Sequence, residues 1–142
     1  MTVNLKQLME DLERDEGRVN HAYQDHLGYW TIGIGHLIDK NKGGGLSDKM
    51  VDAIFLEDID NVIQELGNAF PWFHELPEPA ARGLCNMAFQ LGLPNLSHFV
   101  KMLTALHARD WKQAAHEALH SKWAMQTPER AQRVAALYLE CV

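Results

Sequence analysis

The chain has 142 residues, of which 46% are hydrophobic and 23% are charged, so it is long enough for one domain and excludes a disordered or collagen-like chain. Its net charge is −6, and residues 1–70 carry 13 acids against 6 bases, which excludes nucleic acid as the expected partner because phosphate binding needs clustered Lys and Arg. Two cysteines are too few for a secreted disulfide framework, and no apolar run approaches the ~18 residues of a membrane span. We therefore expect no stable membrane association, and the acids of the N-terminal segment argue against export by a cleaved signal.

The first segment predicts a helix. Apolar residues recur at the i, i+3, i+4, i+7 spacing of one helical face: Leu5, Leu8, Met9 and Leu12. Asn4 is the expected N-cap, and Gly17 is the expected C-terminal stop. Glu16 then lies on the last turn, where the negative end of the helix dipole disfavours an ionised carboxyl group.

Residues 20–38 predict a β-hairpin. Aromatic and β-branched residues flank a loop at residues 25–28 that contains Gly28: Tyr23, Tyr29, Trp30, Thr31, Ile32 and Ile34. Gly33 and Gly35 indicate a bend or a close approach of the backbone within the second strand.

Ser47 is the expected cap of a long helix that ends near Leu66. One face of this helix carries Val51, Phe55, Asp58 and Val62. Because burial of an unpaired carboxylate is costly, Asp58 on this apolar stripe is expected to pair with a cation.

Every segment from Pro71 onward predicts a helix. One helix runs from Pro79 to Leu91 and stops at Gly92. Three further helices are expected, capped by Asn95 (with Leu96, Phe99, Val100, Leu103 and Leu106 inward), by Asp110 (residues 111–119) and by Thr127 (carrying Val134, Leu137 and Tyr138). Met50, Met87, Met102 and Met125 are expected to fill the core.

The predicted fold class is α+β, mostly α. Residues 1–142 form a single domain with a small N-terminal lobe at residues 1–46, a connecting helix at residues 47–66 and a helical lobe at residues 67–142.

Two carboxyl groups point to glycoside hydrolysis. Glu16 ends a helix, and Asp25 follows on the hairpin, so the two side chains can face one cleft. Glycosidases need one carboxyl group protonated as the acid and one ionised as the base or nucleophile. Thr31, on the return strand, can help to hold a water molecule.

Three blocks carry a more specific pattern. The first comprises residues 15–17, 22–25 and 28–37 (DEG, AYQD and GYWTIGIGHL), the second residues 86–92 (NMAFQLG) and the third residues 121–131 (SKWAMQTPERA). In this order they resemble the signature of the phage-type lysozymes, the family of the phage endolysins. The resemblance implies a lysozyme-like fold, although the short segment between His36 and Ser47 implies a smaller sheet than is usual in the family.

The resemblance also implies residue roles. Glu16 matches the general acid, Asp25 the base that orients the attacking water, and Thr31 its hydroxyl partner, in a reaction that inverts the anomeric centre. Three residues match supporting positions: Arg130 the arginine that pairs with the catalytic glutamate, and His36 and Asp58 a histidine–aspartate pair. Leu37 and Phe89 match positions that line the sugar cleft, and neither a metal nor another cofactor is implied.

A second motif suggests a different chemistry. His116, Glu117 and His120 form an HExxH pattern, whose spacing is typical of zinc peptidases, and Glu140 is a conceivable third ligand. With 8 histidines in the chain the pattern also arises by chance. A zinc metallopeptidase therefore remains one alternative, and a non-catalytic wall-binding module of lysozyme fold is another.

These observations favour a muramidase that cleaves the β-1,4 bond between N-acetylmuramic acid (MurNAc) and N-acetylglucosamine (GlcNAc) in peptidoglycan. We expect a monomeric endolysin of a phage or prophage that lyses the host cell. It would accumulate in the host cytoplasm and reach the cell wall or periplasm through the membrane lesion that a holin makes.

Overall fold

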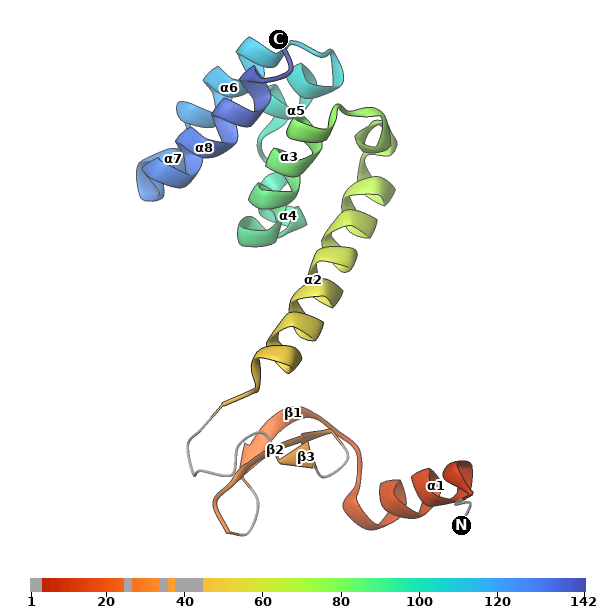
Figure 1. Cartoon of the computed structure of the whole chain (residues 1–142). Coiled ribbons are helices and arrows are strands. Elements are labelled where there is room, and N and C mark those ends of the chain that lie inside the picture. The colour runs from red at the N-terminus through yellow and green to blue at the C-terminus, as the bar shows by residue number, and fades with distance from the viewer. Residues whose placement is uncertain (1–3, 25–26, 34–35, 38–44) are drawn as a thin grey trace. The chain divides into compact units, whose positions relative to one another are not determined.

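The structure is a computed structural model that describes residues 4–24, 27–33, 36–37 and 45–142, apart from the side chains of Leu8 and Glu16 (Figure 1). It divides into two compact units, residues 1–54 and residues 55–142. The division falls within the predicted connecting helix. The fold is α+β and mostly α, as the sequence predicts.

Helix α1 (Leu5–Glu16) begins and ends where its caps predict. The side-chain oxygen of Asn4 accepts a hydrogen bond from the backbone N–H of Gln7 at 3.1 Å. Gly17 follows the last turn with φ at 75°, and its N–H donates to the carbonyl oxygen of Glu13 at 2.8 Å. Glycine adopts this positive φ without steric cost, so Gly17 fixes Glu16 as the last helical residue.

The sheet has three antiparallel strands in the order β1 (Val19–Gln24), β2 (Trp30–Gly33) and β3 (His36–Leu37). In the register, Thr31 of β2 lies opposite Tyr23 and also opposite Leu37. The bend predicted at Gly33 is confirmed, but the second strand of the hairpin does not continue beyond it as one strand. Strand β2 ends at Gly33, whose φ is 71°, and a new strand begins at His36, while Gly35 lies outside the described residues.

Helix α2 (Asp48–Ala69) starts as predicted, because the hydroxyl of Ser47 accepts a hydrogen bond from the N–H of Met50 at 3.3 Å. It extends three residues beyond the predicted end at Leu66. Three residues of the expected apolar stripe are exposed: Val51, Phe55 and Asp58. The C-terminal turns of α2 are the part that packs against the core of the helical unit, through Leu66 and the half-buried Val62.

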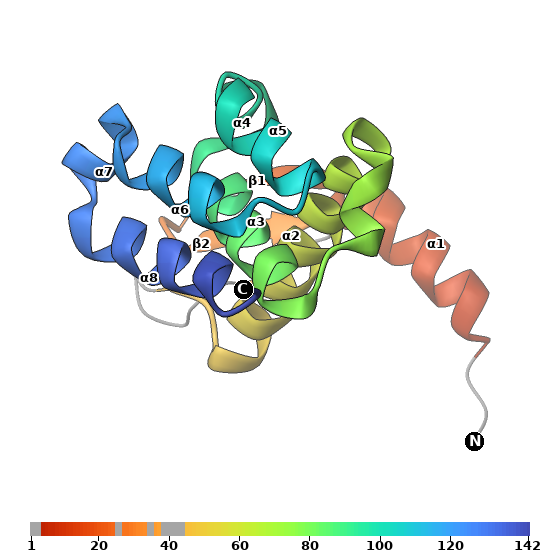
Figure 2. The same cartoon turned by 90° about the horizontal axis from the view of Figure 1, so that it is seen from above.

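The helical unit continues after α2 with one 3₁₀ helix and six α-helices (Figure 2). These are η1 (Pro71–Glu75), α3 (Glu78–Leu91), α4 (Leu93–Leu96), α5 (Val100–His107), α6 (Trp111–Leu119), α7 (Lys122–Gln126) and α8 (Pro128–Leu139). Helix α8 packs against α3 and α6, and α6 also packs against α5. Among the described residues, no helix is both long and apolar enough to cross a membrane.

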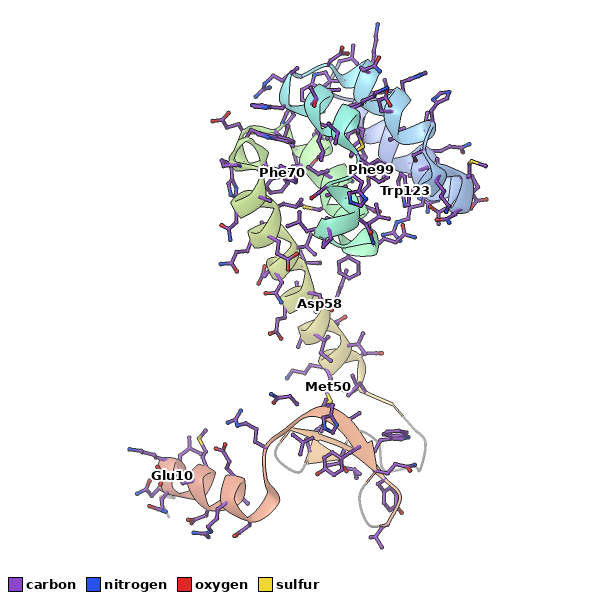
Figure 3. The ribbon with its side chains drawn as sticks, turned by 180° about the vertical axis from the view of Figure 1, so that it is seen from behind. Glu10, Met50, Asp58, Phe70, Phe99 and Trp123 are labelled. Atoms are coloured by element: carbon purple, nitrogen blue, oxygen red, sulfur yellow. The ribbon has the colours of Figure 1, made fainter. Side chains whose placement is uncertain are left out.

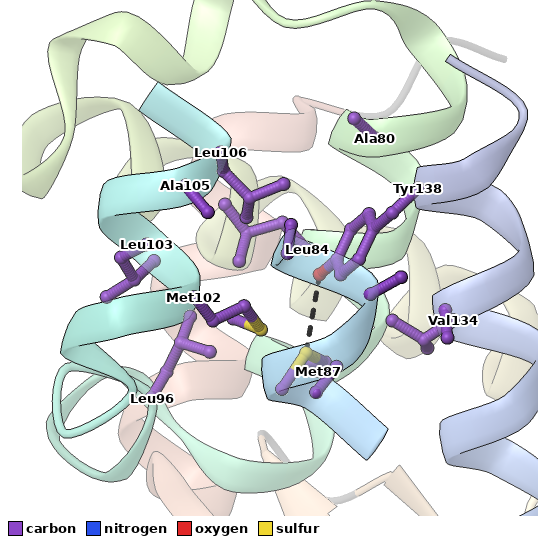
Figure 4. Close-up of a cluster of buried hydrophobic side chains, with 14 of the residues drawn as sticks. Ala80, Leu84, Met87, Leu96, Met102, Leu103, Ala105, Leu106, Val134 and Tyr138 are labelled. Atoms are coloured by element: carbon purple, nitrogen blue, oxygen red, sulfur yellow. Dashed lines mark hydrogen bonds between the residues drawn. The ribbon is translucent and has the colours of Figure 1, made fainter. Parts of the chain in front are cut away.

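Tyr138 is one of the fully buried side chains in the core of this unit (Figure 4). Its side chain is fully buried, and its hydroxyl donates a hydrogen bond to the sulfur of Met87 at 3.4 Å. Gly83 of α3 leaves room for the ring, because a Cβ at this position would lie 2.9 Å from Cε1 of Tyr138.

The half-buried Cys85 and Cys141 are free thiols, and burial raises the pKa of the Cys85 thiol.

The cap at Asp110 is confirmed, since its carboxylate accepts from the N–H of Gln113 at 3.1 Å. The cap at Asn95 is wrong. Asn95 lies within α4 and donates to the carbonyl oxygen of Leu91, while α5 begins later, at Val100.

Two predicted core residues, Val100 and Met125, are instead 64% and 84% exposed. Thr127 precedes α8 as predicted, but its hydroxyl donates to the carbonyl oxygen of Trp123 and makes no cap bond.

Candidate active site

The predicted catalytic residues all fall in the first unit. Glu16 is the last residue of α1, and its side chain lies outside the described part of the structure. Asp25 also lies outside the described residues. The arrangement of the two carboxyl groups is therefore still a prediction.

A salt bridge between Arg18 and Glu13 spans the C-terminal end of α1. The guanidinium of Arg18 donates to the carboxylate of Glu13 at 2.8 Å across the helix end. This hydrogen bond and the charge of Arg18 lower the pKa of Glu13, although both side chains are exposed. Glu13 is thus ionised and paired beside the turn at Gly17, which leads the chain from Glu16 into β1.

Thr31 lies on the central strand of the sheet and is buried. Its hydroxyl donates a hydrogen bond to the carbonyl oxygen of Tyr29 at 3.2 Å. Because a hydroxyl oxygen also carries two acceptor lone pairs, Thr31 in this orientation can accept a hydrogen bond from a water molecule. Leu37, which is opposite Thr31 on β3, is 42% exposed, so it is open to a ligand.

Arg130 lies in the first turn of α8 and is held by Asn86 of α3. Its Nε donates to the side-chain oxygen of Asn86 at 2.7 Å, and its Nη2 donates to the backbone oxygen of the same residue at 3.1 Å. Two bonds from one guanidinium fix both its position and its orientation. The predicted pairing of Arg130 with Glu16 joins residues of different units and stays a prediction.

Arg130 and Asn86 both line a groove of about 800 Å³ on the helical unit. Its lining is mostly apolar and includes Phe89, which is 44% exposed and meets the ring of Phe55 edge to face, with centroids 5.9 Å apart. An exposed aromatic ring of this kind can pack on the apolar face of a sugar.

His36 and Asp58 lie in different units, so their predicted pairing also stays a prediction. His36 is on β3, and its Nε2 is 3.2 Å from the sulfur of Met50. Asp58 is exposed on α2 (Figure 3).

The HExxH residues lie on α6. The rings of His116 and His120 stack with centroids 4.0 Å apart, and the carboxylate of Glu117 accepts a hydrogen bond from the side-chain amide of Gln113 at 2.8 Å. In the described part of the chain, no group of three or more His, Cys, Asp or Glu residues could hold a metal ion.

Asn86 and Gln90 were given no role by sequence reasoning, yet each holds a residue of another helix. Asn86 fixes Arg130, and the side-chain oxygen of Gln90 accepts a hydrogen bond from the indole N–H of Trp123 at 2.9 Å. Both belong to the block at residues 86–92, and their polarity beside buried Met87 and Ala88 was the available signal.

The phage lysozyme family model matches residues 13–138, which include Glu16, Asp25 and Thr31 as well as Arg130. The chain belongs to the phage lysozyme family. It is accordingly a glycoside hydrolase, and this favours the lysozyme interpretation over both the zinc-peptidase and the non-catalytic alternatives.

Curated proteins support the family assignment along most of the chain. "Probable T4-type lysozyme 2" of Dictyostelium discoideum is 31% identical, with 92% of each chain covered. The pre-baseplate central spike protein Gp5 of Enterobacteria phage T4 is 33% identical over 93% of this chain, which spans 27% of that longer protein. An endolysin of Acyrthosiphon pisum secondary endosymbiont phage 1 is 28% identical, with 79% of this chain and 73% of that protein covered.

Proposed function

We propose that this enzyme is a peptidoglycan muramidase that cleaves the β-1,4 bond between C1 of MurNAc and O4 of GlcNAc. The observation that carries the proposal is the family match over residues 13–138, which spans Glu16, Asp25 and Thr31 in order. The orientation of the Thr31 hydroxyl supports the proposal. The hydroxyl donates its proton to the carbonyl oxygen of Tyr29, so its oxygen can still accept a hydrogen bond from a water molecule.

Glu16 acts as the general acid. It donates its proton to O4 of GlcNAc as the bond from O4 to C1 of MurNAc breaks. A water molecule donates one hydrogen bond to Asp25 and one to Thr31, so that a lone pair on its oxygen faces C1. The water attacks C1 from the side opposite the leaving group, Asp25 takes up its proton, and the product forms as the α-anomer.

The supporting roles rest on the resemblance. Arg130 pairs with the carboxyl group of Glu16, and Asn86 already holds its guanidinium through two hydrogen bonds. His36 pairs with Asp58, and Leu37 and Phe89 line the sugar cleft, to which both bring an exposed apolar side chain.

Analysis of the newly formed chain ends tests the reaction. The enzyme is incubated with purified peptidoglycan, and free amino groups are assayed in one portion of the products. A second portion is reduced with borohydride and then hydrolysed to its constituents. We expect reduced muramic acid and no new amino groups. Reduced glucosamine would contradict the position of cleavage, and new amino groups without reducing ends would favour the peptidase.

In the cell, we propose that the enzyme acts as a monomeric endolysin that accumulates in the host cytoplasm and reaches peptidoglycan after a holin opens the membrane. The similarity to an endolysin supports this setting. Expression in the bacterial cytoplasm should leave cells intact until the membrane is permeabilised with chloroform, and the culture should then clear. Clearing without permeabilisation would contradict the need for a holin.

A further inference from the structure

The stacked histidines of α6 have no role in the proposed hydrolysis. His116 lies in the last turn of the helix, and His120 follows as its C-cap. The N–H of His120 still donates to the carbonyl oxygen of His116 at 3.0 Å, so the backbone keeps the helical spacing that places both rings on one face. Both side chains are exposed, and their ring centroids are 4.0 Å apart with 25° between the planes.

A second hydrogen bond fixes the tautomer of His120. Its Nδ1 lies 2.8 Å from the carbonyl oxygen of His116. A carbonyl oxygen can only accept, so Nδ1 carries the proton and Nε2 of the neutral ring carries a lone pair. A backbone carbonyl that holds one ring nitrogen in this way is the usual outer partner of a metal-binding histidine, because it orients the ring and makes the other nitrogen more basic.

The surroundings also suit a cation. The last carbonyl groups of a helix give its C-terminus a partial negative charge, which favours a positive ion there. A hollow of about 390 Å³ lies beside the ring of His120, so the outer side of the site has room for water ligands. Its lining includes Glu117 and His98, and also Lys101, whose ammonium group weakens the attraction for a cation.

We infer that His116 and His120 form a chelating site for one divalent transition-metal ion. Two imidazole nitrogens hold the ion, and water molecules complete its coordination shell. Imidazole ligands select borderline ions, so the expected order of affinity is Cu²⁺ above Ni²⁺ above Co²⁺, with Mg²⁺ excluded. The ring of His116 opens from the stacked position by rotation of its exposed side chain, while the hydrogen bond from Nδ1 keeps the ring of His120 in place. The site takes no part in hydrolysis.

Calorimetric titration of the full chain with Ni²⁺ tests the site. We expect one ion per chain, an affinity about tenfold or more weaker in both His116→Ala and His120→Gln, and no change in His98→Ala, the matched control from the same hollow. Circular dichroism of each variant confirms that the helices remain folded. Added Ni²⁺ should also raise the melting temperature of the wild type, and a chelator should reverse the rise.

Three results would overturn the inference: no binding by the wild type, wild-type affinity in His116→Ala, or equal binding of Mg²⁺, which would indicate a carboxylate site. The release of reducing ends from peptidoglycan, measured with and without chelator, separates this site from the proposed hydrolysis. We expect equal rates, and a loss of hydrolysis that returns on addition of the metal would contradict a site without a catalytic role.

Discussion

Replacement of Tyr138 by phenylalanine should make the protein more resistant to alkali. Burial raises the pKa of this phenol far above its usual value of 10.0, with a smaller contribution from nearby Cys85. The folded state therefore keeps the proton, whereas the unfolded chain releases it above about pH 10. The contribution of Tyr138 to stability is complete below that pH and is lost as the pH rises toward the raised value. The slope is about 1.4 kcal/mol per pH unit, so the loss reaches about 1.4 kcal/mol by about pH 11.

Urea unfolding followed by circular dichroism, from about pH 8 to about pH 11, measures this effect. Near pH 8 the wild type and Tyr138→Phe should agree within about 1 kcal/mol, because the hydroxyl bonds only to the weak acceptor sulfur of Met87 at 3.4 Å. By about pH 11 the variant should gain about 1.4 kcal/mol relative to the wild type. Met87→Leu keeps the phenol and should follow the wild-type slope. Parallel curves for the wild type and Tyr138→Phe would refute the reasoning.

Three further changes test the helical unit. Gly83→Ala should lower the free energy of unfolding by about 1 kcal/mol. The clash of the new Cβ with the ring of Tyr138 destabilises the fold by about 1–3 kcal/mol, whereas the better helix propensity of alanine stabilises it by about 1 kcal/mol. A variant that is more stable than the wild type in urea unfolding would contradict this packing. Asp110→Ala should cost about 1 kcal/mol through loss of the N-cap of α6, and an unchanged urea midpoint would argue against the cap. In a Cys141→Ser variant, Cys85 should react with iodoacetamide more slowly in the folded protein than in urea, since burial raises its pKa and so reduces the thiolate fraction. Equal rates in the two states would show that burial does not protect the thiol.

The ends of several helices could be predicted from the sequence because a cap is a local interaction. Asn4, Ser47 and Asp110 each bond to a backbone N–H three residues ahead, so the short sequence contains both partners. Asn95 has the same side-chain chemistry, but Gly92 and Pro94 begin the one-turn α4 ahead of it. Two helix-start signals therefore lie close together, and the identity of the residues alone does not decide which of them begins a helix.

The burial of α2 was harder to predict. Its apolar stripe correctly indicates a helix, but Val51 and Phe55 are exposed because the C-terminal turns of the helix are the part that meets the core of the helical unit. The periodicity of apolar residues shows that a helix has an apolar face. How much of that face is buried depends on the tertiary structure, which periodicity does not report.

The candidate site shows the same limit. The position of Glu16 at the end of α1 follows from Gly17, one residue away. The contact between Arg130 and Asn86 joins residues 44 positions apart, so spacing along the chain carries no sign of it. The family resemblance predicts the role of Arg130, and the structure identifies Asn86 as the residue that holds its guanidinium.

The rate at which Glu16→Gln releases reducing ends from purified peptidoglycan tests the central claim most directly. Glu10→Gln is the matched control, since Glu10 is an exposed acid of the same helix (Figure 3). An amide cannot donate the proton that the leaving oxygen requires, so Glu16→Gln should be about 10²–10⁴-fold slower than the wild type, with an unchanged circular dichroism spectrum. Glu10→Gln should match the wild type. A folded Glu16→Gln variant that stays within about tenfold of the wild-type rate would contradict Glu16 as the general acid.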